Sequence, residues 1–439
     1  MMPISRSPSR SSSITRSHRR IAVAGPAALK HLTDDNPTYF KEDRPWPPDV
    51  RSWPLLSHAP VVVIGGGASG LSAAAALRHR GIGSVVLEQD AAIGGTWTRR
   101  YDRLHLHTMR EFSGLAHFPI PQRYPRYLSR AQFAEYLQEY AEHFELNVVT
   151  GAQVNRIHRH GPDWTIETAV NKARPTYTSR VVVIATGQYR EPAVPAWPGR
   201  DLYCGRLLHS SGYANAAPYA GQRVLVVGAG NSGAEIATDL AEGGASGSAQ
   251  VRASFVALSV RTPPPIVPRD PFGLPVQRTS LVLSLLPPAF ADRAARTTAK
   301  LALGDLTRYG MPAAAFTPYH RRQVPLIDVG FVAALKRGAI AIRPALSGLT
   351  PDGCRFADGT TGVFDAIVAA TGFTTGLRGL LDADGVLDEA GEPIGRSGEP
   401  TAAAGLYFVG FVHSLRGHLF EANRATRRLA RRVERYLDS

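Results

Sequence analysis

Cysteine is scarce in this chain. Only two of the 439 residues are cysteines, Cys204 and Cys354, and neither belongs to a C-x-x-C pair. A disulfide framework and a thiol redox centre are therefore not indicated. Any redox chemistry must be carried by bound cofactors instead.

Long apolar runs are also missing. A membrane-spanning helix needs roughly 18 consecutive apolar residues, and the nearest candidate, residues 281–286, ends in Pro287-Pro288. We expect no membrane span. The hydrophobic fraction of 44% and the charged fraction of 20% are typical of a globular enzyme, and the length suits two or three domains.

Acidic residues are absent from residues 1–33, where six basic residues lie among many serines. Without those six, the net charge of +14 becomes +8. The composition is that of a transit peptide, and a disordered extension or an upstream mis-start fits it equally. We expect a cytoplasmic protein, with organellar targeting as the alternative. An apolar h-region is lacking, which disfavours secretion.

The C-terminal segment carries a basic stripe, in which Arg424, Arg428, Arg431 and Arg435 recur at spacings of four, three and four. Such a stripe indicates a solvated helix face. We expect no nucleic-acid partner.

Two glycine-rich fingerprints occupy residues 65–70 and 228–233. Each follows an apolar run and opens an Ala-rich, helix-like segment, so both stand where a strand turns into a helix. The first Gly permits the turn, the second lets a pyrophosphate approach, and the third lets helix pack on strand. Two dinucleotides are predicted, with electron transfer between them. The candidate residues are Gly65, Gly67, Ala68, Ser69 and Gly70 in the first, and Gly228, Gly230, Asn231, Ser232 and Gly233 in the second.

The strands after the two fingerprints end in different residues. Glu88 ends the strand predicted after the first, 18 residues beyond Gly70, where it can accept from a ribose hydroxyl of FAD. The corresponding strand of the second fold, residues 255–260, has no acid at its end, only Ser259 and Arg261. These residues suit a 2′-phosphate, which favours NADPH over NADH.

Twin strand endings suggest how the domains are arranged. Residues 181–184 and 366–369 are apolar runs closed by Ala185-Thr186-Gly187 and Ala370-Thr371-Gly372. They predict an α/β protein with two nested Rossmann-like dinucleotide-binding domains, the FAD domain being interrupted by the NADPH domain. The predicted segments are an N-terminal extension (1–54), the first part of the FAD domain (55–205), the NADPH domain with a Pro-rich helical excursion (206–324), and the second part of the FAD domain (325–439).

Further motifs resemble the class B flavin monooxygenases. They are Gly94-Gly95-Thr96-Trp97 and the run from Tyr203 to Tyr213, a form of the signature F-x-G-x-x-x-H-x-x-x-F/Y with Tyr203 for Phe. Residues 101–107, 309–310, 325–330 and 405–411 look like the YUCCA-type branch. The resemblance covers roughly residues 58–437.

The resemblance implies a monooxygenase in which NADPH reduces FAD and O2 adds at flavin C4a. The resulting (hydro)peroxyflavin then transfers oxygen to a small organic substrate. We include nine further residues among the cofactor-binding candidates: Gly95, Thr96, Trp97, Val154, Thr186, Gly187, Thr371, Gly372 and Gly410.

His107 is the catalytic candidate, because it aligns where animal-type relatives carry an Asn beside flavin and nicotinamide. His105 shares its strand face, but no third ligand is near in sequence, so we expect no metal and interpret His105 as a core residue. His209 is expected to organise the linker between the domains.

The substrate stays open at this point. The resemblance suggests an aryl 2-oxo acid that is oxidatively decarboxylated. Baeyer–Villiger oxygenation of a ketone, oxygenation of an amine or thioether, and an uncoupled NADPH oxidase that makes hydrogen peroxide are the alternatives. Residues 417–420 replace a Gly-rich turn of the YUCCA-type branch with bulkier residues, which predicts a reshaped pocket. The sequence provides no prediction of oligomeric state.

Overall fold

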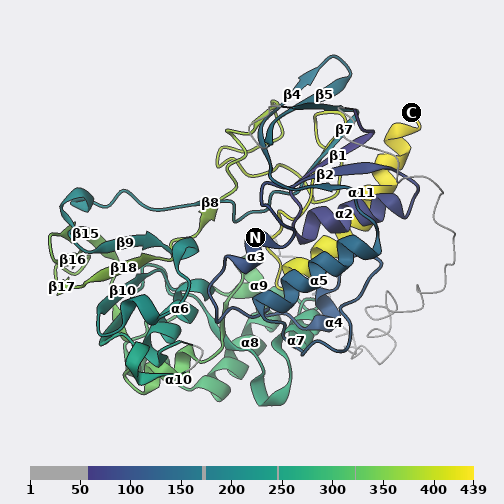
Figure 1. Cartoon of the computed structure of the whole chain (residues 1–439). Helices are drawn as coiled ribbons and strands as arrows, with labels where there is room; N and C mark the ends of the chain where they lie inside the picture. Colours follow the sequence, from purple (N-terminus) through teal and green to yellow (C-terminus); the bar gives the residue numbers. More distant parts are fainter. Residues whose placement is uncertain (1–57, 171–174, 245–246, 322) are drawn as a thin grey trace, which may run out of the picture. The chain divides into compact units, whose positions relative to one another are not determined.

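Two five-stranded parallel sheets form the framework of the protein (Figure 1). The computed structural model describes residues 58–170, 175–244, 247–321 and 323–439, so the predicted N-terminal extension lies outside the described residues. The strand order of the first sheet is β21 (Leu406–Phe408), β7 (Val181–Ile184), β1 (Val61–Ile64), β2 (Ser84–Leu87) and β3 (Val148–Val149).

The second sheet has the order β14 (Ala341–Arg343), β11 (Phe255–Ser259), β10 (Arg223–Val227), β18 (Ala366–Ala369) and β9 (Arg206–His209). All of its neighbouring strands are parallel. In both sheets the central strands are continuous apolar runs buried on both faces, as parallel sheets require. The α/β class with two Rossmann-like folds is confirmed.

Strand pairing places the limit of the second fold later than residue 324. β14 and β18 both lie beyond that residue, yet they pair with β11 and β10 in the second sheet. A short apolar strand carries no local sign of which of two sheets it will join, because both sheets offer similar buried edges. The pairing therefore supports a second domain of about residues 206–372 within a first domain made from both ends of the described chain.

Helices α2 (Ala68–Arg78) and α11 (His418–Leu437) lie side by side on the first sheet (Figure 1). Leu429 and Val433 of α11 are fully buried in one core cluster with Ala73 and Leu77 of α2. Truncating such a leucine to alanine costs about 2–5 kcal/mol of stability. The last helix of the chain is therefore part of the core of the first domain.

Helix α5 (Arg130–His143) starts at a capping box, in which the Ser129 hydroxyl accepts from the Gln132 N–H and the Gln132 side chain accepts from the Ser129 N–H. Its apolar face contributes Phe133, Leu137 and Tyr140 to a second cluster of this domain. The capping signal and the apolar spacing predicted this helix. Two short helices, α3 (Gly95–Thr98) and α4 (Arg110–Ser113), flank the segment that leads to α5.

The second domain carries α6 (Asn231–Glu242) and α10 (Phe331–Lys336) beside its sheet. Its excursion contains α7 (Val276–Leu283), α8 (Pro288–Leu303) and α9 (Pro318–Arg321), bracketed by the paired strands β12 (Ile266–Pro268) and β13 (Leu326–Asp328).

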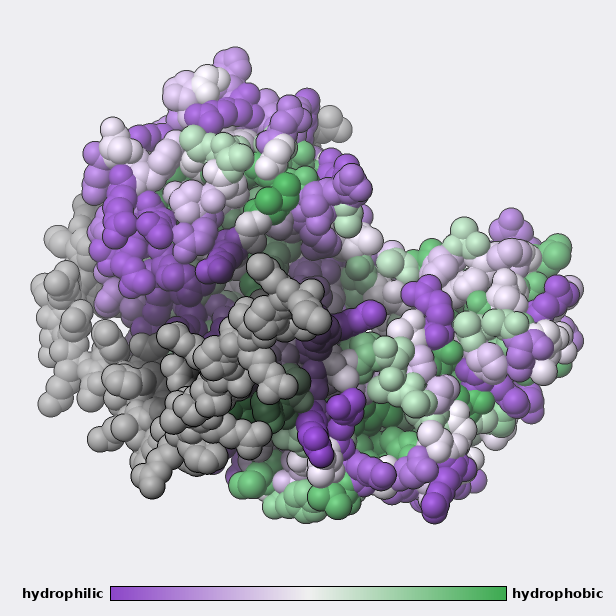
Figure 2. All heavy atoms as spheres, turned by 180° about the vertical axis from the view of Figure 1, so that it is seen from behind, coloured by the Kyte–Doolittle hydropathy of each residue, from purple (hydrophilic) through white to green (hydrophobic). Residues whose placement is uncertain are grey.

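Exposed apolar residues concentrate in the excursion, residues 266–328. In Figure 2, hydrophobic residues line the lower edge of the molecule, where Figure 1 draws α8. The most exposed of the excursion are Phe272, Leu274, Leu285, Phe290 and Leu301.

Smaller sheets complete the fold. β4 (Ala152–His160), β5 (Asp163–Val170), β6 (Thr176–Ser179) and β20 (Leu381–Asp382) form one, and β15 (Leu346–Thr350), β16 (Gly353–Phe356) and β17 (Thr361–Val363) form another. β8 (Glu191–Pro192) pairs with β19 (Phe373–Thr374) where the chain passes between the two domains. Within the described ranges, no helix combines the length and the apolarity that a bilayer crossing requires.

Candidate functional site

The first fingerprint forms the tight turn between β1 and α2. Gly65 has φ +105°, and a Cβ there would lie 2.7 Å from the Ala185 carbonyl oxygen, while a Cβ on Gly70 would lie 1.8 Å from the Gly65 carbonyl oxygen. Gly67 differs, because its φ is −79° and a Cβ would meet no atom within 4 Å. The packing of the chain requires glycine at Gly65 and Gly70, whereas Gly67 borders open space that a pyrophosphate can fill.

Glu88 stands next to this turn at the end of β2. Its carboxylate accepts the N–H of Gly66 at 2.6 Å and the N–H of Asp90 at 2.8 Å. Burial raises the pKa of Glu88, and the two backbone hydrogen bonds act in the opposite direction. Each oxygen keeps lone-pair capacity for a ribose hydroxyl, so the geometry fits the predicted role.

Other candidates gather at the same edge of the first sheet. Thr186 Oγ1 is buried without a hydrogen-bond partner, and Gly187 has φ +80° with no atom near its Cβ position. Gly410 follows β21, and a Cβ on it would lie 2.4 Å from Ser69 Oγ. The unsatisfied hydroxyl and the open space above Gly67 and Gly187 fit a bound FAD.

Three candidates from the G-G-T-W motif lie in or at the start of α3. Gly95 is needed for packing, since a Cβ would lie 2.5 Å from Asp90 Oδ2. Trp97 packs edge-on against Phe133 with ring centroids 4.6 Å apart, and Thr96 is exposed. Val154, on β4, is buried in the core cluster that also holds Leu87. Ala68 is buried at the first turn of α2.

The second fingerprint repeats the first geometry between β10 and α6. Gly228 has φ +110° and lies against the Ala370 carbonyl oxygen, and a Cβ on Gly233 would lie 1.8 Å from the Gly228 carbonyl oxygen. Gly230 again borders open space, with no atom within 4 Å of its Cβ position. The Asn231 amide oxygen accepts the Ile327 N–H at 2.7 Å and so ties the turn to β13.

Ser259, at the end of β11, was predicted to contact NADPH, but its hydroxyl is engaged elsewhere in the structure. Ser259 is 1% exposed, donates to the Pro344 carbonyl at 2.8 Å and accepts the Leu346 N–H at 3.0 Å. Its hydroxyl holds the chain after β14 and is closed to a phosphate. Arg261 is exposed and makes no ion pair with a described residue, so it alone of this pair suits a 2′-phosphate.

The second Ala-Thr-Gly ending lies at the passage between the domains. Thr371 Oγ1 donates to the Ala193 carbonyl at 2.5 Å. The Gly372 carbonyl accepts from His209 Nε2 at 2.9 Å, and the His209 ring meets Phe373 edge-on. Burial lowers the pKa of His209, which favours the neutral ring. His209 therefore links β9 to the chain between the domains, as the signature predicted.

His107 reaches from the first domain to the second. Its Nε2 lies 2.6 Å from Oε1 of Glu235 on α6, and the Glu235 side chain is 3% exposed. Burial raises the pKa of the Tyr101 hydroxyl well above the usual value, and the nearby Glu235 carboxylate acts in the same direction. Sequence reasoning missed Glu235 and Tyr101, because nothing local marks partners 128 residues apart.

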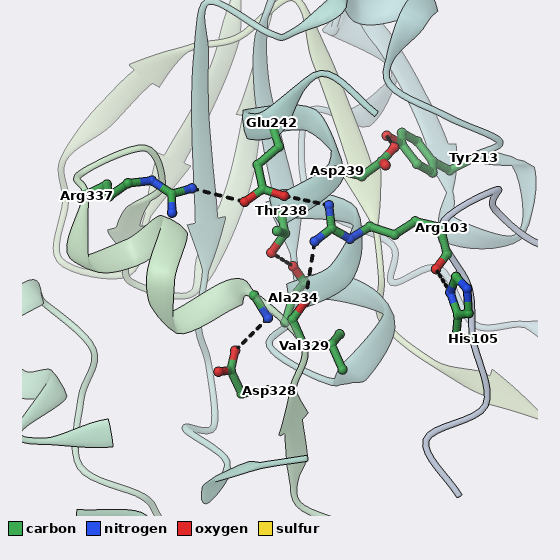
Figure 3. Close-up of polar contacts among 11 residues, drawn as sticks. Arg103, His105, Tyr213, Ala234, Thr238, Asp239, Glu242, Asp328, Val329 and Arg337 are labelled. Carbon is green, nitrogen blue, oxygen red and sulfur yellow. Dashed lines mark hydrogen bonds and ion pairs between the residues drawn. The ribbon is translucent and has the colours of Figure 1, made fainter. Parts of the chain in front are cut away.

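A groove of about 990 Å³ opens beside His107. Residues between 102 and 127 of the first domain line it, as do residues of α6 and, after α10, Arg337 and Ala339 of the second domain. One wall is an ion-pair network around Arg103, shown in Figure 3. Arg103 donates to Glu242 at 2.6 Å and to the Val329 carbonyl at 3.4 Å, and Arg337 donates to the other oxygen of Glu242 at 3.0 Å.

His105 is exposed and lines this groove, so its interpretation as a core residue is wrong. Its Nδ1 lies 2.8 Å from the Arg103 carbonyl oxygen. Residues 105–107 form no strand, but His105 and His107 both line the groove. Among the described residues, no cluster of three or more His, Cys, Asp or Glu side chains could hold a metal ion.

Gln277 of α7 is a further residue that the sequence did not reveal. It is 4% exposed, accepts the Met109 N–H at 2.8 Å and donates to the Arg416 carbonyl at 2.8 Å. A Cβ on Gly417 would lie 2.8 Å from its amide nitrogen. The excursion thus fixes the segment after His107 and the turn before α11.

Residues 62–264 match the family described as pyridine nucleotide-disulphide oxidoreductase. The chain is 33% identical over 368 residues to indole-3-pyruvate monooxygenase YUCCA8 of Oryza sativa subsp. indica, covering 80% of this chain and 85% of that protein. It is 34% identical over 363 residues to indole-3-pyruvate monooxygenase YUCCA6 of Arabidopsis thaliana, covering 80% of this chain and 85% of the relative. Among solved structures, the flavin-containing monooxygenase from Stenotrophomonas maltophilia matches with a TM-score of 0.64 and 26% identity, over 87% of this chain and 99% of that one.

Proposed function

The chain belongs to the YUCCA-type branch of the flavin-dependent monooxygenases, and on that basis we propose that it oxidatively decarboxylates an aryl 2-oxo acid. FAD and NADPH are its cofactors, as in this family. The observation that carries the proposal is the identity of about a third with enzymes named for indole-3-pyruvate, sustained over 80% of this chain.

The proposed reaction balances with O2, NADPH and a proton as the other reactants. A 2-oxo acid R–CH2–CO–COO⁻ reacts with O2, NADPH and a proton and gives R–CH2–COO⁻, CO2, water and NADP⁺. The bond between the two carbonyl carbons breaks, and one oxygen atom of O2 enters the new carboxylate while the other leaves as water. Bound FAD supplies hydride acceptance and the reaction with O2.

The protein's own part is to bind, orient and exclude water. We propose that Gly67 and Glu88 hold FAD and that Gly230 and Arg261 hold NADPH. His107 is proposed to position a proton beside the reacting groups, with its ring fixed by Glu235. Both glycines border open space in the folded chain, which supports the placement of a pyrophosphate at each turn.

A product assay tests this function. FAD-loaded enzyme is given NADPH in air with indole-3-pyruvate or phenylpyruvate, and the acid product, CO2 and hydrogen peroxide are measured. One CO2 and one shortened acid per NADPH support the proposal. Oxygenation of a ketone, amine or thioether in place of the 2-oxo acid would support those alternative substrates, and hydrogen peroxide as the only product would indicate an NADPH oxidase.

A thiol redox centre, of the kind that a disulfide reductase uses, has no support in the described residues. Cys204 is exposed and Cys354 is buried, and neither forms a disulfide. Burial raises the pKa of Cys354 to about 12, so this thiol stays protonated and unreactive near neutral pH.

A further inference from the structure

Arginines outnumber carboxylates on the groove wall near residues 125–127. Arg269 Nε lies 3.3 Å from Asp270 Oδ2, and Arg126 lies 4.0 Å from Asp270 Oδ1. The same Asp270 accepts the Tyr127 hydroxyl at 2.6 Å. One carboxylate thus faces two guanidinium groups, and this wall keeps a net positive charge.

On the opposite wall of the groove, arginines also outnumber carboxylates. Arg103 and Arg337 share the single carboxylate of Glu242. Arg252, which also lines the groove, makes no ion pair with any described side chain. Asp102 and Glu235 add negative charge, but Arg130 pairs with Asp102, and Glu235 is buried against His107. The potential in the groove is therefore positive, and it favours an anion.

Backbone pairing brings the first wall next to His107. His105 forms a bridge with Ser129, the Leu106 N–H donates to the Leu128 carbonyl at 2.8 Å, and the Arg110 N–H donates to the Arg126 carbonyl at 2.9 Å. These bonds hold the segment that contains Tyr127 against the segment that contains His107. Both residues line the groove.

Tyr127 and Arg269 form a compact aromatic and cationic unit at that point. The Arg269 guanidinium lies over the Tyr127 ring, 4.1 Å from its centroid, and Asp270 fixes the ring through its hydroxyl. The Arg269 side chain is 29% exposed, so it is partly desolvated yet reachable from the groove. Guanidinium donors in a fixed plane match the two oxygens of a carboxylate.

We propose that this groove binds the carboxylate of the substrate through Arg269 and Arg126, beside His107, and that the enzyme thereby selects anionic over neutral substrates. The inference rests on the proposed function for the identity of the acid, and it adds the residues that recognise the acid group. A groove of about 990 Å³ has the size of a small-molecule site.

The test measures, by titration calorimetry, the equilibrium binding of phenylpyruvate to the FAD-loaded full chain without NADPH. Arg269→Gln and Arg126→Gln each remove one guanidinium, and we expect each to weaken binding by about tenfold, the usual effect of losing a charged hydrogen bond. Arg308→Gln is the matched control, because its side chain is 81% exposed and lies outside the groove. This control should bind phenylpyruvate as the unsubstituted protein does.

A further variant should change the affinity for phenylpyruvate in the opposite direction. Asp270→Asn removes the carboxylate that competes with the ligand for both arginines, while its amide oxygen can still accept the Tyr127 hydroxyl. We expect Asp270→Asn to bind phenylpyruvate several-fold more tightly. The neutral methyl ester of phenylpyruvate should bind all these variants and the parent alike.

Failure of this inference differs from failure of the proposed function. Equal binding of phenylpyruvate by the parent, Arg269→Gln and Arg126→Gln would overturn the carboxylate site, and so would absence of binding to the parent. Arginine-dependent binding without any decarboxylation would keep the site and overturn the proposed reaction.

Discussion

His107 Nε2 and Glu235 Oε1 lie 2.6 Å apart, although His107 comes from the first domain and Glu235 from the helix that follows the second fingerprint. The imidazole N–H donates to a carboxylate that is 3% exposed. A buried charged acceptor fixes the ring orientation more firmly than a neutral one, because charge-assisted hydrogen bonds are about twice as strong. This contact couples the position of the catalytic candidate to α6, the helix proposed to bind NADPH.

Glu235→Gln should loosen His107 without changing the size of the side chain. We expect the fraction of NADPH electrons lost as hydrogen peroxide to rise about three- to tenfold, since the neutral amide gives a weaker hydrogen bond. The KM for NADPH should stay within about twofold. Glu434→Gln is the control, because Glu434 pairs with Arg80 outside the groove, and its hydrogen peroxide fraction should match the parent. An unchanged fraction in Glu235→Gln would show that Glu235 does not position His107.

Gly67→Ala should prevent FAD retention while leaving the apoprotein folded. A Cβ at Gly67 meets no protein atom within 4 Å, so it can clash only with a ligand. Gly70→Ala is the contrasting variant, because its Cβ would lie 1.8 Å from the Gly65 carbonyl oxygen and the turn itself must distort. Flavin absorbance and the melting temperature of the apoprotein separate the two effects. Full FAD retention by Gly67→Ala would contradict the placement of the pyrophosphate.

Arg261→Gln should raise the KM for NADPH about tenfold or more and leave the KM for NADH unchanged, because only NADPH carries the 2′-phosphate. Ser259→Ala should behave differently. Its hydroxyl is buried and bonded to two backbone groups, so its loss should lower stability by about 1–3 kcal/mol with little effect on coenzyme choice. Equal effects of Arg261→Gln on the two coenzymes would exclude a phosphate contact.

Asp239 makes stability depend on pH. Its carboxylate accepts the Tyr213 hydroxyl at 2.6 Å, and burial raises its pKa above the usual 3.8. The folded state then holds the proton more tightly than the unfolded state, so the free energy of unfolding falls as pH rises from about 4 through the folded pKa. Urea unfolding of the apoprotein over this window should show a steeper fall for the parent than for Asp239→Asn. Parallel curves would refute this effect of Asp239.

Much of the framework could be predicted, because the signals for it are local. The apolar runs before residues 65 and 228 and the glycines after them specify β1, α2, β10 and α6. The serine and glutamine of the capping box likewise specify the start of α5. Each of these signals lies within a few residues of the structure that it predicts.

The errors concern residues whose environment is built by distant segments. Ser259 is engaged by residues 344 and 346, about 85 positions later, and that engagement leaves no trace in its own strand. His105 stands between Leu104 and Leu106, an apolar setting that suggests a core residue, but its own side chain is exposed and lines the groove. Glu235 and Gln277 were missed for the same reason, since their partners lie more than a hundred residues away.

The nesting of the domains also sets an order of events during synthesis. All five strands of the second sheet lie between residues 206 and 369, so that sheet can close while the ribosome is still adding residues. The first sheet waits for β21, and its core waits for α11, which ends at Leu437. The proposed flavin site is therefore complete only after α11 has been synthesised, later than the second domain, which lies within the first domain in the sequence.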